Sequence, residues 1–178
     1  MNEVVSKFSS YNIFNYLVPG TVLCLFLHGQ QLIYLDRIDI VAKLVVFYVV
    51  GMAVSRVGSL ILDPLMKRAG LIQRSSYNDY VRATSEDNMV SVLLETSNTY
   101  RTMTGACGIG LIAYLLSAVL PEAWLRHGAA GAILIAAATA LFAFAYIKQN
   151  RSITRRVSAN KAIRPANDPA TSPRELAG

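Results

Sequence analysis

The sequence predicts an all-α integral membrane protein built as a four-helix bundle, and three observations lead to this fold class. Hydrophobic residues make up 53% of the 178 residues and charged residues only 16%, with a mean hydropathy of +0.38, which is typical of membrane proteins. Four apolar stretches are long enough to cross a hydrocarbon core of about 30 Å. Most of the seventeen Lys and Arg residues then fall on one side of the bilayer, as the positive-inside rule requires.

The first predicted span covers residues 13–35 and contains Pro19-Gly20. The proline either kinks this span or lies in the first turn of a span that begins there. The leader carries one lysine, and no A-x-A cleavage site follows the apolar stretch. We therefore expect a retained transmembrane helix rather than a cleaved signal.

The second span, 38–62, carries small residues at Gly51, Ser55 and Ser59. A spacing of four places them on one stripe of a helix, where small side chains allow a second helix to approach closely in lipid. We expect Asp63-Pro64 to end or redirect this helix, because a residue before proline disfavours the helical conformation.

The connector 63–101 is predicted to be cytoplasmic because basic residues gather in it and at its edges. Ser85 is a candidate N-cap for a helix that meets no proline or glycine until Gly105 and continues into the third span, 102–120. Spans 2 and 3 would thus extend into a cytoplasmic helical hairpin. Its exposed tip offers three candidate residues for docking a partner: Tyr77, Tyr80 and Arg82.

The third and fourth spans add further small-residue faces. Ala106 and Gly110 are four apart in the third span, and the fourth span, 129–147, is rich in alanine. Such faces predict a tight bundle over residues 1–147 and contacts between copies of the chain, hence a homo-oligomer. The remaining 148–178 form a basic cytoplasmic tail, predicted to be an amphipathic helix on anionic lipid as far as about residue 163 and disordered beyond it.

Arg56 stands one residue off the small stripe and allows two interpretations. It is either an interfacial arginine that obeys the positive-inside rule, or part of a polar junction or pore mouth. The third helix would enter the membrane opposite it, so the candidate junction comprises Arg56, Asp63, Asn98, Tyr100 and Arg101.

No catalytic constellation is present in the sequence. H-E-x-x-H, a phosphate-binding glycine loop with its lysine, and G-x-S-x-G are all missing. His28 and His127 lie on different connectors, and Cys24 and Cys107 lie in apolar runs without a C-x-x-C. We expect no metal and no cofactor. The positive charge is explained by membrane topology, so we expect no direct contact with nucleic acid.

Four motifs resemble a family of small bacterial membrane proteins that mostly lack an assigned function. The motifs are Y-N-x-x-N-Y-L-x-P-G at 11–20, S-R-x-G-S-L-x-x-x-P at 55–64, Y-x-x-Y at 77–80 and N-x-Y-R-T at 98–102. The four-span layout with cytoplasmic ends is also similar to that of the membrane subunit of the Kiwa anti-phage defence system. That similarity implies a membrane oligomer paired with a soluble partner that docks on the cytoplasmic connector.

We therefore expect a non-enzymatic, homo-oligomeric, multi-pass protein of the bacterial inner membrane with both termini in the cytoplasm. It would contact membrane lipid and act as an anchor or sensor for a cytoplasmic protein partner, in a setting such as anti-phage defence. The alternative is an oligomeric ion channel or membrane-disrupting effector.

Overall fold

The computed structural model describes residues 2–73, 76–119 and 129–163. Residues 121–128, between the third and fourth predicted spans, and the tail beyond residue 163 lie outside these ranges. The described chain is helical and contains no strand, so the all-α prediction is confirmed. Its elements are α1 (Asn2–Gly29), α2 (Ile40–Val57), the π-helical turn η1 (Gly58–Leu62), α3 (Asp63–Arg68), α4 (Tyr77–Glu86), α5 (Asn88–Val119) and α6 (Ala129–Ile163).

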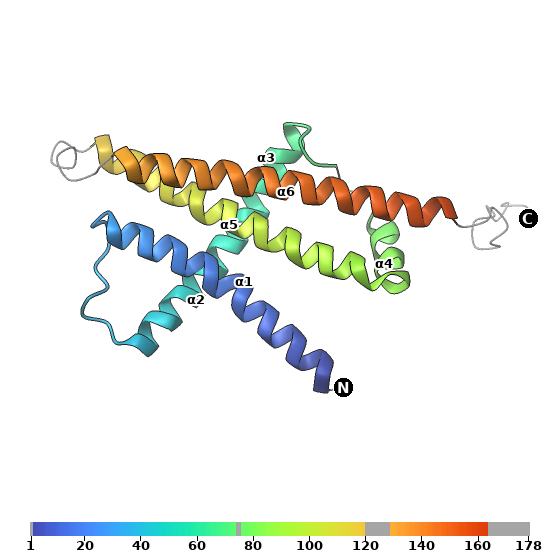
Figure 1. Cartoon of the computed structure of the whole chain (residues 1–178), viewed down its shortest axis with the longest axis horizontal. Helices are drawn as coiled ribbons and strands as arrows, with labels where there is room; N and C mark the ends of the chain where they lie inside the picture. The colour runs from blue at the N-terminus through green and yellow to red at the C-terminus, as the bar shows by residue number, and fades with distance from the viewer. Residues whose placement is uncertain (1, 74–75, 120–128, 164–178) are drawn as a thin grey trace, which may run out of the picture.

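The longest helices, α5 and α6, run antiparallel and side by side over most of their length (Figure 1). α1 packs on α2 and α5, while α2, η1 and α3 follow one another obliquely across the pair. The start of α1, α4 and the last turns of α6 lie toward one end of the molecule. The connector 30–39 lies at the other end (Figure 1).

The extended hairpin is formed by α5 and α6, and not by the second and third predicted spans. A stripe of buried side chains on α6 explains this difference. The stripe extends the packing surface of this helix beyond residue 147, into the basic segment. Its members follow one another at intervals of four, three and four, which keeps them on one face of a helix. They are all almost fully buried: Tyr146, Asn150, Ile153 and Val157.

The predicted tail is helical as far as residue 163, but it does not form a separate helix. Residues 148–163 continue α6, and Ile153 and Val157 lie in one buried cluster with Ala83 of α4 and Val90 of α5. The apolar face of this segment therefore packs against protein and is not available to lie flat on lipid. We call the part made of α4, the start of α5 and the end of α6 the lobe.

α1 and α2 cross at two glycines that touch each other's backbone. A Cβ on Gly20 would lie 1.8 Å from the carbonyl oxygen of Phe47, and a Cβ on Gly51 would lie 1.7 Å from that of Tyr16. Only residues without a side chain allow this approach, which also permits Cα–H···O contacts between the helices. α1 is one helix with Pro19 inside it, so it does not begin at the proline. It ends at Gly29, earlier than the predicted boundary at residue 35.

The second predicted span does not end at Asp63-Pro64. Helical structure continues through η1 and α3 to Arg68, and the backbone N–H of Asp63 donates to the carbonyl of Gly58, five residues back. In a regular α-helix, the ring of Pro64 would clash with the carbonyl four residues earlier. The wider π turn removes this clash and places the proline in the first turn of α3, where its missing N–H is tolerated.

The long third helix begins at Asn88, two residues later than predicted. Ser85 lies inside α4, and the side chain of Asp87 accepts the backbone N–H of Met89 at 2.9 Å instead. Asp87 also receives a hydrogen bond from Nε of Arg156 at 2.6 Å. The acid therefore caps α5 and ties it to α6, a pairing that local sequence does not reveal.

By length and composition, two helical segments of the described chain could cross a membrane: Ile40–Arg68 and Ala130–Ala159. The apolar helix at Ile13–Gly29 is shorter, and α5 is not among these segments. Only 28% and 11% of the most apolar stretches of the two segments are buried within the protein. A core helix of a water-soluble protein would have most of that surface covered.

Candidate functional site: a polar layer around α5

One short stretch of α5 makes polar contacts with α1, α2, α3 and α6. We call this set the polar layer, and most of its members are buried although they lie among apolar helices. It comprises Ser97, Thr99, Arg101 and Thr102 of α5, Asn15 of α1, Ser55 of α2, Asp63 of α3, and Tyr146 and Asn150 of α6.

The centre of the layer is a buried ion pair with a tyrosine. Nη1 of Arg101 lies 3.4 Å from Oδ2 of Asp63, and the hydroxyl of Tyr146 donates to Oδ1 of the same carboxylate. The Asp63 side chain is 6% exposed and that of Arg101 is 13% exposed. Asp63 thus joins α3 to both α5 and α6. A charge pair this deep is stable only when its remaining polar atoms also find partners.

One polar atom of this centre has no partner among the described residues. Nε of Arg101 is buried and forms no hydrogen bond there. Leaving a buried donor unpaired is unfavourable by about 1–3 kcal/mol. The arginine is therefore held by its carboxylate and its packing rather than by a complete set of hydrogen bonds.

Gly58 packs against the arginine, and a Cβ there would be in ordinary van der Waals contact with it. A Cβ on this first residue of the π turn would lie 3.5 Å from Cγ and 3.8 Å from Nε of Arg101. The π turn also rotates the chain so that Asp63, five residues later, faces α5. π turns of this kind often mark functional positions in helices.

The rest of the layer consists of neutral hydrogen bonds. Oγ1 of Thr99 donates to Oδ1 of Asn15 at 3.1 Å, and Nδ2 of Asn150 donates to Oγ of Ser97 at 3.2 Å. The hydroxyls of Thr102 and Ser55 lie 3.5 Å apart. A hydrogen bond within a protein contributes a net stabilisation of only about 0.5–1.5 kcal/mol, so these links define positions as much as they add stability.

The predicted junction is only partly assembled as expected. Asp63 and Arg101 meet, but Arg56 is exposed and forms no ion pair with a described residue. Tyr100 packs beside the cluster of Met66, Ile72 and Tyr146. Asn98 is partly buried, and its carbonyl accepts the hydroxyl of Thr102 at 2.8 Å.

The predicted small-residue faces lie in three different environments. Gly51 contacts α1, Ser55 is buried next to α5, and Ser59 is partly exposed with its hydroxyl donating to the Arg56 carbonyl. Ala106 is fully buried with Leu23 and Val54, and a Cβ on Gly110 would lie 3.1 Å from Phe26. These faces therefore serve packing within the chain in at least four of the five positions.

The predicted docking residues lie on α4. Tyr80 is partly buried against the lobe cluster of Ala83, Val90, Ile153 and Val157. Tyr77 and Arg82 fall within α4, and their side chains lie outside the described part of the structure.

Sequence reasoning missed Asn15, Tyr146 and Asn150. Each is a polar or amphipathic residue in or beside an apolar helix, and such residues usually have a polar partner in a membrane protein. The run S-N-T-Y-R-T on α5 offers partners for several helices at once. Nothing in the sequence alone assigns which helix each member contacts.

The carboxylate of the layer is occupied by its neighbours. Asp63 is engaged by two donors, and no group of three His, Cys, Asp or Glu side chains among the described residues could hold a metal ion. The fold and site thus define an all-helical protein with two helices apolar enough to cross a membrane, joined by a buried polar layer. No family model, curated protein or solved structure matches the chain.

Proposed function

We propose that the protein is a non-enzymatic, multi-pass anchor of the bacterial inner membrane that presents its lobe to a cytoplasmic protein. The observation that carries the membrane assignment is the exposure of its apolar helices. Only 11% of the most apolar stretch of α6 is buried, and large side chains such as Leu134 and Phe144 are more than half exposed. Lipid is the environment in which such surface is stable.

In this proposal the polar layer lies near the cytoplasmic boundary of the bilayer. On α6, Tyr146 belongs to the end of the apolar half, and Lys148 follows two residues later. Arg56 and Arg101 lie at a comparable place on their helices, and the exposed side chain of Arg56 can reach the headgroups from there. α1, α2 with α3, α5 and α6 would provide four spans, with both termini on the lobe side.

The docking role is supported by apolar side chains on the lobe, outside the proposed membrane zone. Val81, Met89 and Val92 are each about half exposed, and the last two are three residues apart on one face of α5. Exposed apolar groups on a water-facing part are typical of a protein interface. The alanine-rich face of α6 is available for contacts between copies in a homo-oligomer. The similarity in layout to a phage-defence subunit makes anti-phage defence the biological setting that we propose.

The role is tested by chemical cross-linking in native membranes, followed by purification in a mild detergent and native mass spectrometry. We expect an oligomer that retains a soluble protein, and loss of that protein in the variant Met89→Glu/Val92→Glu. Thr84→Glu is the matched control, because Thr84 is exposed on the same lobe without belonging to the apolar patch. A strict monomer that retains no partner would contradict the proposal.

An ion channel or membrane-disrupting effector is the second candidate, because the polar layer crosses an otherwise apolar bundle. Ion flux through reconstituted liposomes tests it. We expect a channel of this kind to change its conductance when Arg101 is replaced by glutamine. Liposomes without flux at any protein density would exclude this candidate.

A further inference from the structure

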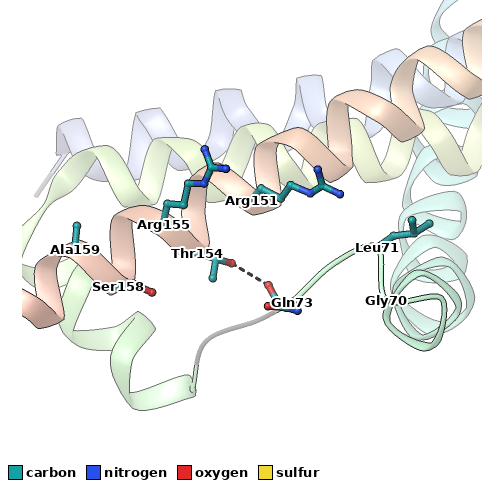
Figure 2. A pocket seen from close by; sticks show the side chains of 8 residues that line it. All are labelled: Gly70, Leu71, Gln73, Arg151, Thr154, Arg155, Ser158 and Ala159. Atoms are coloured by element: carbon teal, nitrogen blue, oxygen red, sulfur yellow. Dashed lines mark hydrogen bonds between the residues drawn. The ribbon is translucent and has the colours of Figure 1, made fainter.

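A groove opens where the chain after α3 runs along the end of α6 (Figure 2). Its volume is about 590 Å³. We call it the arginine groove, and its lining residues are Gly70, Leu71, Gln73, Arg151, Thr154, Arg155, Ser158 and Ala159.

The two walls of the groove are fixed to each other. Oγ1 of Thr154 donates to the carbonyl of Gln73 at 2.9 Å, the contact drawn in Figure 2. Ile72, between Leu71 and Gln73, is 3% exposed and packs with Met66 and Tyr146. The groove is thus shaped by buried contacts rather than by a loose loop.

The charges in the groove are unbalanced. Arg151 and Arg155 are four residues apart on α6, where like charges repel each other. Both are exposed and form no ion pair with a described residue, whereas the adjacent Arg156 is paired with Asp87. None of the described residues that line the groove is acidic. Two guanidiniums without an ion-pair partner among the described residues suit a phosphate group, which guanidinium binds through two parallel hydrogen bonds.

The position of the groove favours a lipid as the source of the phosphate, a step that rests on the proposed membrane location. At 1.5 Å per residue, Arg151 lies about 6 Å and Arg155 about 12 Å along α6 beyond Ile147, the end of the apolar half. The headgroup layer on each side of a bilayer is about 5–8 Å thick. Arg151 is therefore at headgroup depth, on the leaflet whose surface is negatively charged.

We propose that the arginine groove binds the phosphate of an anionic membrane lipid, with Arg151 on the phosphate oxygens at headgroup depth and the long side chain of Arg155 reaching back to them from the next turn of α6. A zwitterionic lipid fits less well, because no carboxylate is present to receive its cation. The bound headgroup would relieve the repulsion between the two arginines.

The test uses the full chain in an uncharged detergent and three probes: dihexanoyl-phosphatidylglycerol, dihexanoyl-phosphatidylcholine and inorganic phosphate. Binding is measured by native mass spectrometry and by thermophoresis. We expect the phosphatidylglycerol probe to bind, and Arg151→Gln/Arg155→Gln to weaken it about tenfold or more. The affinity of Arg151→Lys/Arg155→Lys for this probe should lie between those of the wild type and the glutamine variant, since lysine keeps the charge but lacks the planar guanidinium.

The matched control is Arg37→Gln/Arg56→Gln, which removes the same charge from two exposed arginines outside the groove. Equal weakening in both double variants, or equal binding of the two lipids to the wild type, would overturn the proposal. Inorganic phosphate that binds as tightly as the lipid would overturn the lipid as its source. Release of the chain from membranes by a carbonate wash would contradict the proposed membrane location. It would not decide whether the groove binds phosphate, because the titration with inorganic phosphate tests that separately. Circular dichroism checks that each variant is folded.

Discussion

Asp63→Ala should destabilise the protein more than any change to an exposed charge. The variant leaves the guanidinium of Arg101, 13% exposed and already without a partner at Nε, with no carboxylate, and leaves the hydroxyl of Tyr146 without its acceptor. Removing one partner of a buried ion pair destabilises by about 3–5 kcal/mol. The free energy of unfolding is measured in detergent by circular dichroism with increasing denaturant.

The control for this measurement is Asp36→Ala. Asp36 lies 3.5 Å from His28, but its side chain is 75% exposed, so the loss should be about 0–1 kcal/mol. Asp63→Leu combined with Arg101→Met should recover part of the loss, because no charge is then left buried alone. Equal losses for Asp63→Ala and Asp36→Ala would refute the view that burial makes this pair important.

Three further predictions follow from the packing and the charges. Gly51→Ala should destabilise by about 1–3 kcal/mol because its Cβ would enter the backbone of α1, whereas Gly108→Ala, with nothing within 4 Å, should be neutral or stabilising in the same denaturation assay. The hydrogen bond from Arg156 lowers the pKa of Asp87, so this pair stabilises the fold fully above the ordinary aspartate pKa of about 3.9 and loses its effect as the pH falls through the lowered pKa. A pH series of melting curves should therefore show a larger acid loss for the wild type than for Arg156→Gln. Both cysteines are buried, so a water-soluble maleimide should label them only after unfolding, and labelling of the native protein would contradict the described packing.

Composition and periodicity were sufficient to predict helices and the approximate positions of the apolar ones, because these properties depend on local sequence. The π turn was not predictable in this way. Asp63-Pro64 normally ends a helix, and only the contact of Asp63 with Arg101 and Tyr146 favours a continuous, locally widened helix. Pairing across 38 and 83 residues of sequence determines that local conformation.

The end of α6 carries a helical packing pattern in its sequence, but the positive charges around it obscure that pattern. Its five positive charges indicate a solvated surface, which led to the prediction of a separate tail. Within the same segment, Asn150, Ile153 and Val157 repeat at intervals of three and four, the spacing of a helix face that packs on another helix. A basic segment can therefore carry both a charged face and a core face, and periodicity is the better guide to its fold.

The polar layer has a further consequence for any partner that acts through the lobe. All of its links between helices include α5 or the carboxylate of Asp63, so α5 cannot slide along its neighbours without breaking several of them together. Packed layers of this kind respond by switching between arrangements rather than by gradual deformation. Under the proposed topology, the layer lies between the lobe and the lipid-covered helices. A partner that displaced the start of α5 would therefore act on the layer first. Substitutions of Asp63 or Arg101 would therefore leave the docking surface on the lobe in place. They would change how docking affects the lipid-covered helices.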